Sequence, residues 1–306
     1  MRGLRFFLGL LFLGVAGLAT ADVDGIPDSA TWYFHADFDT MRDGKSSRGI
    51  YDWLNAEVFQ EIRDEVGIDF DQEAERLTAF SSAGAGPVIL LDGNISQDTQ
   101  DKIMAIAAAD GELQTFKSSG KAYYFFDGDG DNTSTGDIDI EIDSLEKEAY
   151  VSFALKDKIV ITNTQDQMKK LLANNGRIES QKSDDNALFV LRAERSMNQA
   201  GLRAAEMDDG HDWDSNILRN TKQLAVMMAD LGDKLGLEAQ LIASEPEMAN
   251  SLASVIRGLI GLQVFNDEMD PDISAVLQST KVDVEGSTLK LSLSLDPDTV
   301  VSALED

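Results

Sequence analysis

Apolar and polar residues alternate along several short segments of the chain, and this alternation predicts β-strands. The clearest case is Leu289–Leu295, where every second residue is leucine and the residues between are lysine or serine. Successive side chains point to opposite sides of a strand, so one face of this strand would be dry and the other wet. Strands of this kind, joined by short polar turns, are typical of an antiparallel sheet.

The predicted strands fall into two series with the same order of elements. Each series opens with a strand, continues with a hairpin that leads into a helix, and closes with a second hairpin and helix. The first series comprises residues 31–38, 76–83, 87–91, 150–155 and 159–161. The second comprises residues 187–193, 223–231, 235–241, 281–284 and 289–295.

Helices are predicted from capping residues followed by apolar stripes. Ser244 and Glu247 form a capping box with proline in the first turn, and an apolar stripe follows from Met248 to Ile260. Shorter helices are predicted to begin at Thr164 and at Asp296. A further helix over 47–66, with its own apolar stripe, has no clear equivalent in the second series.

The sequence therefore predicts an α+β fold, built as a tandem duplication of an antiparallel sheet with helices packed on one face. The first half would cover residues 22–175 and the second half residues 186–306. Residues 176–185, which are polar and of mixed charge, would form the linker. This order of elements argues against a doubly wound parallel sheet with a ligand cleft at its strand ends.

The first 21 residues predict a secretory signal peptide. Arg2 and Arg5 precede an apolar run, Phe6–Leu18, and Ala19-Thr20-Ala21 is the small-x-small pattern of a cleavage site. We expect cleavage after Ala21 and a periplasmic or secreted protein with no transmembrane segment in the mature chain. The alternative is an uncut N-terminal membrane anchor. The chain contains no cysteine, so disulfides and a lipoprotein signal are excluded.

The chain is strongly acidic, with 26 basic and 55 acidic residues and a net charge of −29. Such a surface repels phosphate backbones and anionic lipid headgroups, which makes nucleic acid a poor candidate partner. Basic protein surfaces and cations are the natural partners. The simplest account of the charge is that it keeps the protein hydrated and soluble. The sequence does not indicate an oligomeric state.

One acidic loop has the spacing of a cation site. Asp127, Asp129 and Asp131 alternate with glycines, so their carboxylates could wrap a hard cation such as Ca²⁺. The helix-loop-helix calcium pattern is incomplete, because Asn132 and Ile138 stand where it requires glycine and glutamate. Residues 123–126 and 138–142 flank the loop and predict strands, so this is an acidic loop between strands and not an EF-hand. Because the bidentate ligand is missing, a solvated surface loop is the favoured interpretation.

Both histidines lie among carboxylates. On the opening strand, His35 would share a face with Tyr33 and Asp37, and His35 and Asp37 could contribute to a metal site. Two ligands do not make such a site, so we expect a wet outer face instead. His211 lies in a segment whose composition predicts a loop.

The motifs of common enzyme classes are missing from the sequence. There is no Gly-x-Ser-x-Gly run, no His-Glu-x-x-His and no phosphate loop, so no catalytic residue and no cofactor are assigned. We therefore expect an exported, soluble, non-catalytic binding or interaction protein of the bacterial cell envelope. The alternative is an exported hydrolase that uses a carboxylate pair and is stabilised by a divalent cation.

Overall fold

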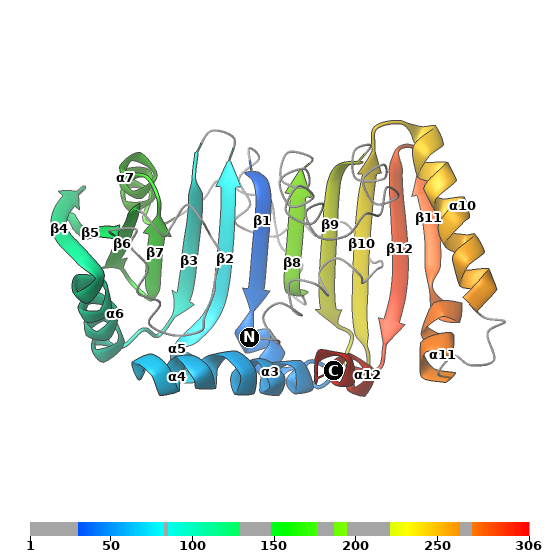
Figure 1. The fold of residues 1–306 in the computed structure, drawn as a ribbon, viewed down its shortest axis with the longest axis horizontal. Helices are drawn as coiled ribbons and strands as arrows, with labels where there is room; N and C mark the ends of the chain where they lie inside the picture. The colour runs from blue at the N-terminus through cyan, green and yellow to red at the C-terminus, as the bar shows by residue number, and fades with distance from the viewer. Residues whose placement is uncertain are drawn as a thin grey trace.

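A single antiparallel sheet runs through the molecule (Figure 1). The computed structural model describes residues 30–82, 85–128, 148–176, 187–194, 221–263 and 271–305. Within these ranges, twelve strands form one sheet and every ladder between neighbouring strands is antiparallel. The predicted α+β class with an antiparallel sheet is therefore confirmed. The strands are β1 (Ala30–Asp37), β2 (Ala74–Ser82), β3 (Pro87–Gly93), β4 (Gly111–Ser118), β5 (Lys121–Gly128), β6 (Glu148–Leu155), β7 (Lys158–Thr162), β8 (Ala187–Glu194), β9 (Thr221–Asp230), β10 (Leu235–Ala243), β11 (Lys281–Glu285) and β12 (Thr288–Leu295).

The order of strands repeats on the two sides of the central pair β1–β8. Moving outward from the centre, the first half runs β1-β2-β3-β7-β6 and the second half runs β8-β9-β10-β12-β11. Strands β5 and β4 then extend the first half beyond β6. The repeated order is a property of the topology, and tandem duplication remains our interpretation of it.

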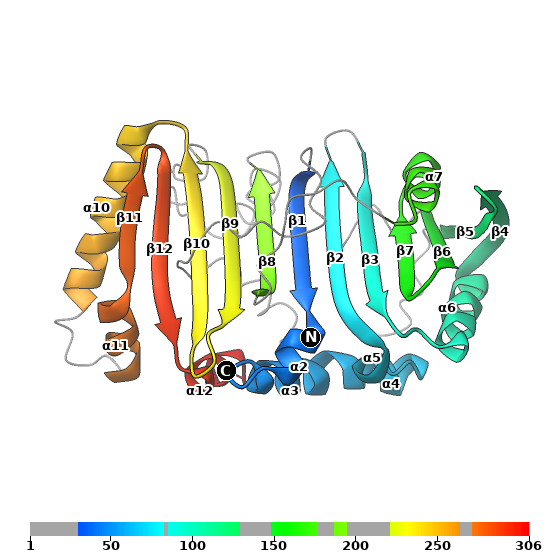
Figure 2. The same ribbon diagram turned by 180° about the vertical axis from the view of Figure 1, so that it is seen from behind.

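The two predicted halves are joined by the ladder between β1 and β8. Its register runs from Trp32 opposite Ala193 to Ala36 opposite Phe189. The sheet is therefore continuous across the predicted boundary, and its centre is made of the opening strand of each half (Figure 2). The boundaries at 175 and 186 stay predictions, since residues 177–186 lie outside the described ranges.

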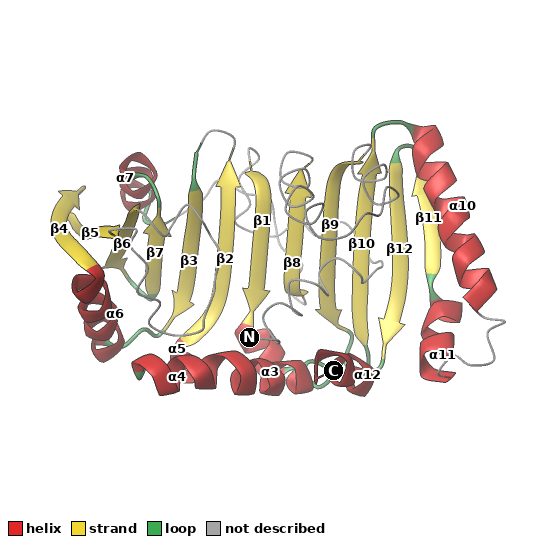
Figure 3. Cartoon of the chain, viewed as in Figure 1, coloured by secondary structure: helices red, strands yellow, loops and turns green. Residues whose placement is uncertain are grey.

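Helices line one end of the strands and the two outer ends of the sheet (Figure 3). The segments α2 to α5 and α12 run along the end of the sheet at which β1 ends and β2 begins. Helices α6 and α7 lie near β4–β7, and α10 and α11 lie beside β11. No described helix is long and apolar enough to cross a membrane. The helices are α2 (Phe38–Asp43), α3 (Arg48–Leu54), α4 (Gln60–Val66), α5 (Phe70–Glu73), α6 (Gln97–Asp110), α7 (Gln165–Ala173), α10 (Pro246–Gln263), α11 (Pro271–Ser279) and α12 (Pro297–Glu305), with a π-helical turn, η1 (Asn55–Phe59), between α3 and α4.

The helices α7 and α10 cover opposite faces of the sheet. In an antiparallel ladder, residues directly opposite one another have their side chains on the same face of the sheet. Following these pairs from strand to strand places Leu291 on β12 and Ile161 on β7 on one face. Leu291 packs with α10, whereas Val160, which points the other way from Ile161, packs with Met168 of α7. These two helices therefore pack on opposite faces of the sheet, although the buried cluster on the α7 face extends into the second half through Val190 and Met227.

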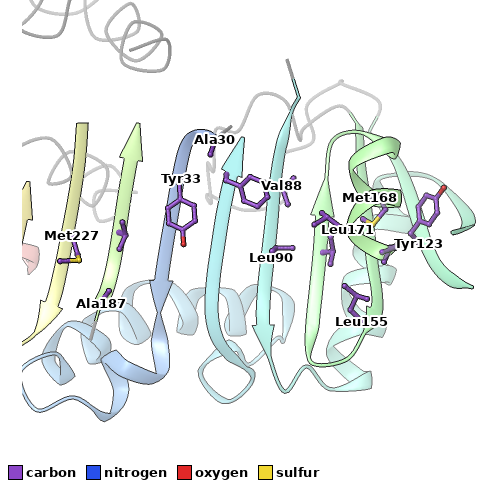
Figure 4. Close-up of a cluster of buried hydrophobic side chains, with 14 residues drawn as sticks. Ala30, Tyr33, Val88, Leu90, Tyr123, Leu155, Met168, Leu171, Ala187 and Met227 are labelled. Carbon is purple, nitrogen blue, oxygen red and sulfur yellow. The ribbon is translucent and has the colours of Figure 1, made fainter. Parts of the chain in front are cut away.

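Two large clusters of buried side chains make up the centre of the core. One lies on the α7 side and reaches across the sheet from Tyr123 to Met227 (Figure 4). The other packs the ends of the central strands against α2, α3 and α12, and includes Phe38, Tyr51 and Phe59. The edge helices are thus anchored to the sheet through apolar side chains, which leaves their outer side in solvent.

Candidate functional site

The acidic loop proposed as a cation site begins where the described part of β5 ends. The backbone of Asp127 lies in β5, opposite Glu112 on β4 and Glu148 on β6. Asp129 and Asp131 lie outside the described residues, so calcium binding by this loop stays a prediction. Within the described ranges, no group of three or more acidic or histidine side chains is arranged to hold a metal ion.

His35 lies on a buried part of the sheet, and the expectation of a wet outer face there is wrong. Tyr33, its neighbour on the same face, is completely buried. The His35 ring nitrogen Nδ1 lies 2.9 Å from the hydroxyl of Thr78 on β2. Burial lowers the pKa of His35 despite the opposing effect of Asp37, so the ring is neutral near pH 7. The sequence did not predict that this face is covered, because tyrosine and histidine occur on both solvent-exposed and buried faces of a sheet.

The carboxylates near His35 have structural roles. Asp37 accepts a hydrogen bond of 2.8 Å from the backbone N–H of Thr40 and so caps α2. Asp39 lies in α2 and forms an ion pair of 2.7 Å with Arg42. The suggested pairing of His35 with Asp37 on a metal therefore gains no support from the geometry. His211 lies outside the described residues.

A network around Tyr51 ties the edge helices together. The Tyr51 hydroxyl accepts a hydrogen bond of 3.0 Å from Arg42 Nε and donates one of 2.5 Å to the Asp71 carboxylate. The Arg42 guanidinium also donates to the backbone carbonyls of Asp71 and Ala74. Burial and the bond to Asp71 raise the pKa of Tyr51 to about 12. Because these groups satisfy one another, the network holds α2, α3 and α5 in place rather than serving as a reaction centre.

Asp230 fastens the edge helices to the second half of the sheet. Its carboxylate accepts hydrogen bonds from the Ser47 hydroxyl at 3.0 Å, from the Ser46 backbone at 3.3 Å and from the Gly232 backbone at 2.6 Å. Burial alone would raise the pKa of Asp230, but these hydrogen bonds outweigh it and lower the pKa. An ion pair between Lys45 and Asp233 lies beside this contact. The arrangement is a structural clasp between the α2–α3 turn and the β9–β10 hairpin.

Glu238 is the most perturbed carboxylate of the described residues. It lies on β10, opposite Met227 and Ser292, and is only 7% exposed. Its Oε1 atom is 3.8 Å from Lys290 Nζ, and its buried Oε2 atom has no hydrogen-bond partner among the described residues. Burial raises the pKa of Glu238 to about 7, against the opposing effect of Lys290. Among the described residues, the charged side chain next to Glu238 is that of Lys290 and not a second carboxylate.

The substitution Glu238→Gln is expected to stabilise the protein at pH 8 more than at pH 4.5. In the unfolded chain the carboxyl ionises near its usual pKa of 4.5, whereas in the fold it keeps its proton up to about pH 7. Wild-type stability is therefore lost as the pH rises through this window, by up to about 3 kcal/mol. Urea unfolding of both proteins at the two pH values measures the difference.

The control for this experiment is Glu285→Gln, which removes an exposed carboxylate on the same sheet. Its free energy of unfolding should differ from that of the wild type by a similar amount at both pH values. A Glu238→Gln effect that does not change with pH would mean that Glu238 ionises normally in the folded protein.

A row of exposed carboxylates lines the outer side of η1 and α4. Glu57, Glu61 and Asp64 are spaced four and three residues apart and so share one side of the helical run, and Glu65 lies next to them. All four side chains are exposed. On the inner side, Phe59 is buried against the sheet core. We call these four carboxylates the acidic ledge.

No protein-family model matches this chain, and no curated protein matches its sequence. The search of solved structures found crystal form III of TP0453, with a TM-score of 0.43 and 9% identity over 94% of this chain and 98% of that chain. Crystal form I of TP0453 gives a TM-score of 0.42 with 10% identity over 94% of this chain and 97% of that chain. A likeness this distant carries no information about function.

Proposed function

We propose that this protein is an exported, soluble, acidic, non-catalytic interaction protein of the bacterial cell envelope. The acidic ledge, formed by Glu57, Glu61, Asp64 and Glu65, would contact a basic surface of a partner protein. The single observation that carries this proposal is the exposure of four carboxylates along one side of η1 and α4.

Electrostatic repulsion within the acidic ledge supports this proposal. Like charges four residues apart destabilise a helix by about 0.2–0.5 kcal/mol per pair, and Glu57–Glu61 and Glu61–Glu65 are two such pairs. A basic surface that binds there would relieve this repulsion and would be attracted from a distance by the net charge of −29. The ledge thus gives up some stability of the fold and gains a surface suited to a cationic partner.

Neutralising the acidic ledge is expected to weaken binding to a cationic probe without destabilising the fold. The variant carries Glu57→Gln, Glu61→Gln, Asp64→Asn and Glu65→Gln, and the probe is poly-L-lysine. We expect the dissociation constant at low salt to rise at least about tenfold, because several attractive charges are lost from one surface. Thermal melting should show an unchanged or higher Tm, since repulsion within the helix is removed.

The matched control removes four exposed acids at the other end of the sheet. It carries Glu245→Gln, Glu247→Gln, Asp283→Asn and Glu285→Gln, so its net charge equals that of the ledge variant. Both variants weaken non-specific attraction equally. If both lose the same amount of binding, the acidic ledge is no specific surface and the proposal fails. Salt should weaken wild-type binding in either case.

Export is part of the proposal and rests on the sequence of residues 1–21, which lie outside the described residues. A positive start, a short apolar run and a small-x-small site support cleavage after Ala21 and a periplasmic or secreted location. N-terminal sequencing of protein purified from cells would then begin at Asp22. An intact Met1 in the mature pool would contradict it.

A further inference from the structure

The loop that joins β3 to α6 (Figure 1) carries an acceptor motif for N-linked glycosylation. Asn94-Ile95-Ser96 has the Asn-x-Ser pattern, with a middle residue other than proline, that oligosaccharyltransferases modify. The pattern is short, so it carries weight only where the asparagine lies on a surface loop of an exported protein. The structure meets the first condition, and the second is the export on which the proposed function also rests.

The backbone of this loop turns Asn94 toward solvent. Gly93, which ends β3, is buried and donates a backbone hydrogen bond of 3.0 Å to the carbonyl of Asp157. The N–H of Ile95 then donates to the carbonyl of Gly93 at 2.9 Å, so the chain turns tightly around Asn94. The Asn94 side chain is exposed and forms no hydrogen bond with another described residue. A sugar linked to its Nδ2 atom would extend into solvent.

An acidic residue also stands two positions before the acceptor asparagine, where bacterial oligosaccharyltransferases require one. A carboxylate in that position can pair with a cationic side chain of the enzyme. In this chain the residue is Asp92. A second Asn-x-Ser/Thr motif, Asn132-Thr133-Ser134, has Gly130 in the same position and lies outside the described residues. The two motifs therefore differ in the feature that selects a bacterial acceptor.

We propose that Asn94 is modified with an N-linked oligosaccharide by a membrane oligosaccharyltransferase. The donor is a lipid-linked oligosaccharide whose first sugar is joined at C1 to a pyrophosphate. The Nδ2 atom of Asn94 forms a bond to C1 and loses a proton, while the bond between C1 and the pyrophosphate oxygen breaks. The lipid pyrophosphate leaves, and nothing is oxidised or reduced.

Contacts on both sides of the acceptor indicate that transfer precedes closure of the loop. The Ser96 hydroxyl, which the transferase has to engage, accepts a hydrogen bond of 3.1 Å from the Thr99 backbone at the start of α6. The Glu73 carboxylate accepts bonds from the Ser96 backbone at 3.1 Å and from the Thr99 hydroxyl at 2.9 Å. Asp92 forms an ion pair with Lys158 on β7. The fold therefore holds both flanking residues in contacts that compete with the enzyme.

The first test is mass spectrometry of peptides from the protein purified from the cells that naturally produce it. We expect the peptide containing Asn94 to carry an oligosaccharide and the peptide containing Asn132 to carry none. The variants Asn94→Gln, Ser96→Ala and Asp92→Asn should lose the modification. Ser96→Thr and Asp92→Glu should keep it, because they preserve the motif and the negative charge.

Unmodified Asn94 in the purified protein would overturn the proposal. Equal modification of Asn132 would overturn the selection by Asp92. The N-terminus of the same sample separates this proposal from the proposed function. Protein that begins at Asp22 but has an unmodified Asn94 rejects the glycan and leaves export standing, whereas an intact Met1 rejects export.

A second test measures when transfer occurs. Full-length protein made without a transferase is folded and then incubated with membranes of the producing cells, which contain the enzyme and the lipid-linked donor. We expect wild type to be modified slowly and Glu73→Ala to be modified faster, since the loss of this carboxylate frees Ser96 and Thr99. The control Glu57→Ala removes an exposed acid on η1 and should behave as wild type. Equal rates for wild type and Glu73→Ala would overturn the order of transfer and folding.

Discussion

Replacing Gly93 with alanine is expected to destabilise the protein by about 3–5 kcal/mol, among the larger effects of single substitutions. Gly93 closes β3 with a φ of +153°, a conformation that side chains rarely adopt. An added Cβ atom would also overlap the backbone carbonyl oxygen of Glu73, which precedes β2. Backbone cannot swing aside as a flexible side chain can, so the ladder between β2 and β3 would have to shift. Chemical denaturation measures the loss.

Gly120→Ala separates steric overlap from backbone strain in this experiment. Gly120 also has a positive φ, of +78°, but a Cβ atom there would meet nothing within 4 Å. Its substitution should cost only the strain of a left-handed alanine, about 1–2 kcal/mol. Equal losses for the two variants would show that Gly93→Ala costs no more than alanine at an ordinary left-handed position and that the overlap with Glu73 is relieved at no cost.

The substitution Leu289→Ala is expected to destabilise the protein by about 2–5 kcal/mol. Leu289 is 1% exposed and packs with Leu252 and Ala253 of α10, so its truncation leaves a cavity between helix and sheet. Ser294→Ala on the same strand is exposed and should change the free energy of unfolding by less than about 0.5 kcal/mol. Both values come from urea titrations.

Comparable losses at Leu289 and Ser294 would contradict the alternation assigned to β12. The comparison also tests the position of α10. If Leu289→Ala is mild, α10 does not cover that part of the sheet.

The alternating pattern predicted most strands within a few residues of their observed bounds, because period two is a local property. β12 is the clearest example, with Leu289 and Leu291 buried as expected. The caps also predicted helix starts: Thr164 accepts a hydrogen bond from the Gln167 backbone at the start of α7. Where one local interaction decides the conformation, the sequence was sufficient to predict the strand or the start of the helix.

The sequence pattern predicts neither β4 nor α11, for different reasons. In β4 the apolar residues Leu113 and Phe116 are three apart, so the strand lacks period two, and its partner β5 holds it in the sheet. The start of α11 carries the same Asp-Pro pair that opens α12, a signal that could have been used. Helix α6 follows β3 as the repeated order of elements suggests.

The special side chains of the candidate site could not be predicted, because their properties arise from distant partners. Nothing local marks Glu238 as buried, since an acid between leucine and alanine in β10 fits a wet face equally well. Asp230 meets Ser46 and Ser47 only because the β9–β10 hairpin lies against the α2–α3 turn. The sequence shows that the acids of the acidic ledge lie close together along the chain. Their exposure depends on which side of α4 packs on the sheet, which the sequence does not show.

The two strands at the centre of the sheet, β1 and β8, can pair only late in synthesis, because they lie far apart in the sequence. Among the described strands β1 is synthesised before its partner β8, and the strands β2 to β7 are made between them. Until then β1 is an open edge with Tyr33 on one side and Phe34 on the other, a template for wrong pairing. A chain cut at the predicted linker would yield two fragments still held together by this ladder, and a fragment ending at Asn175 would keep the open edge permanently.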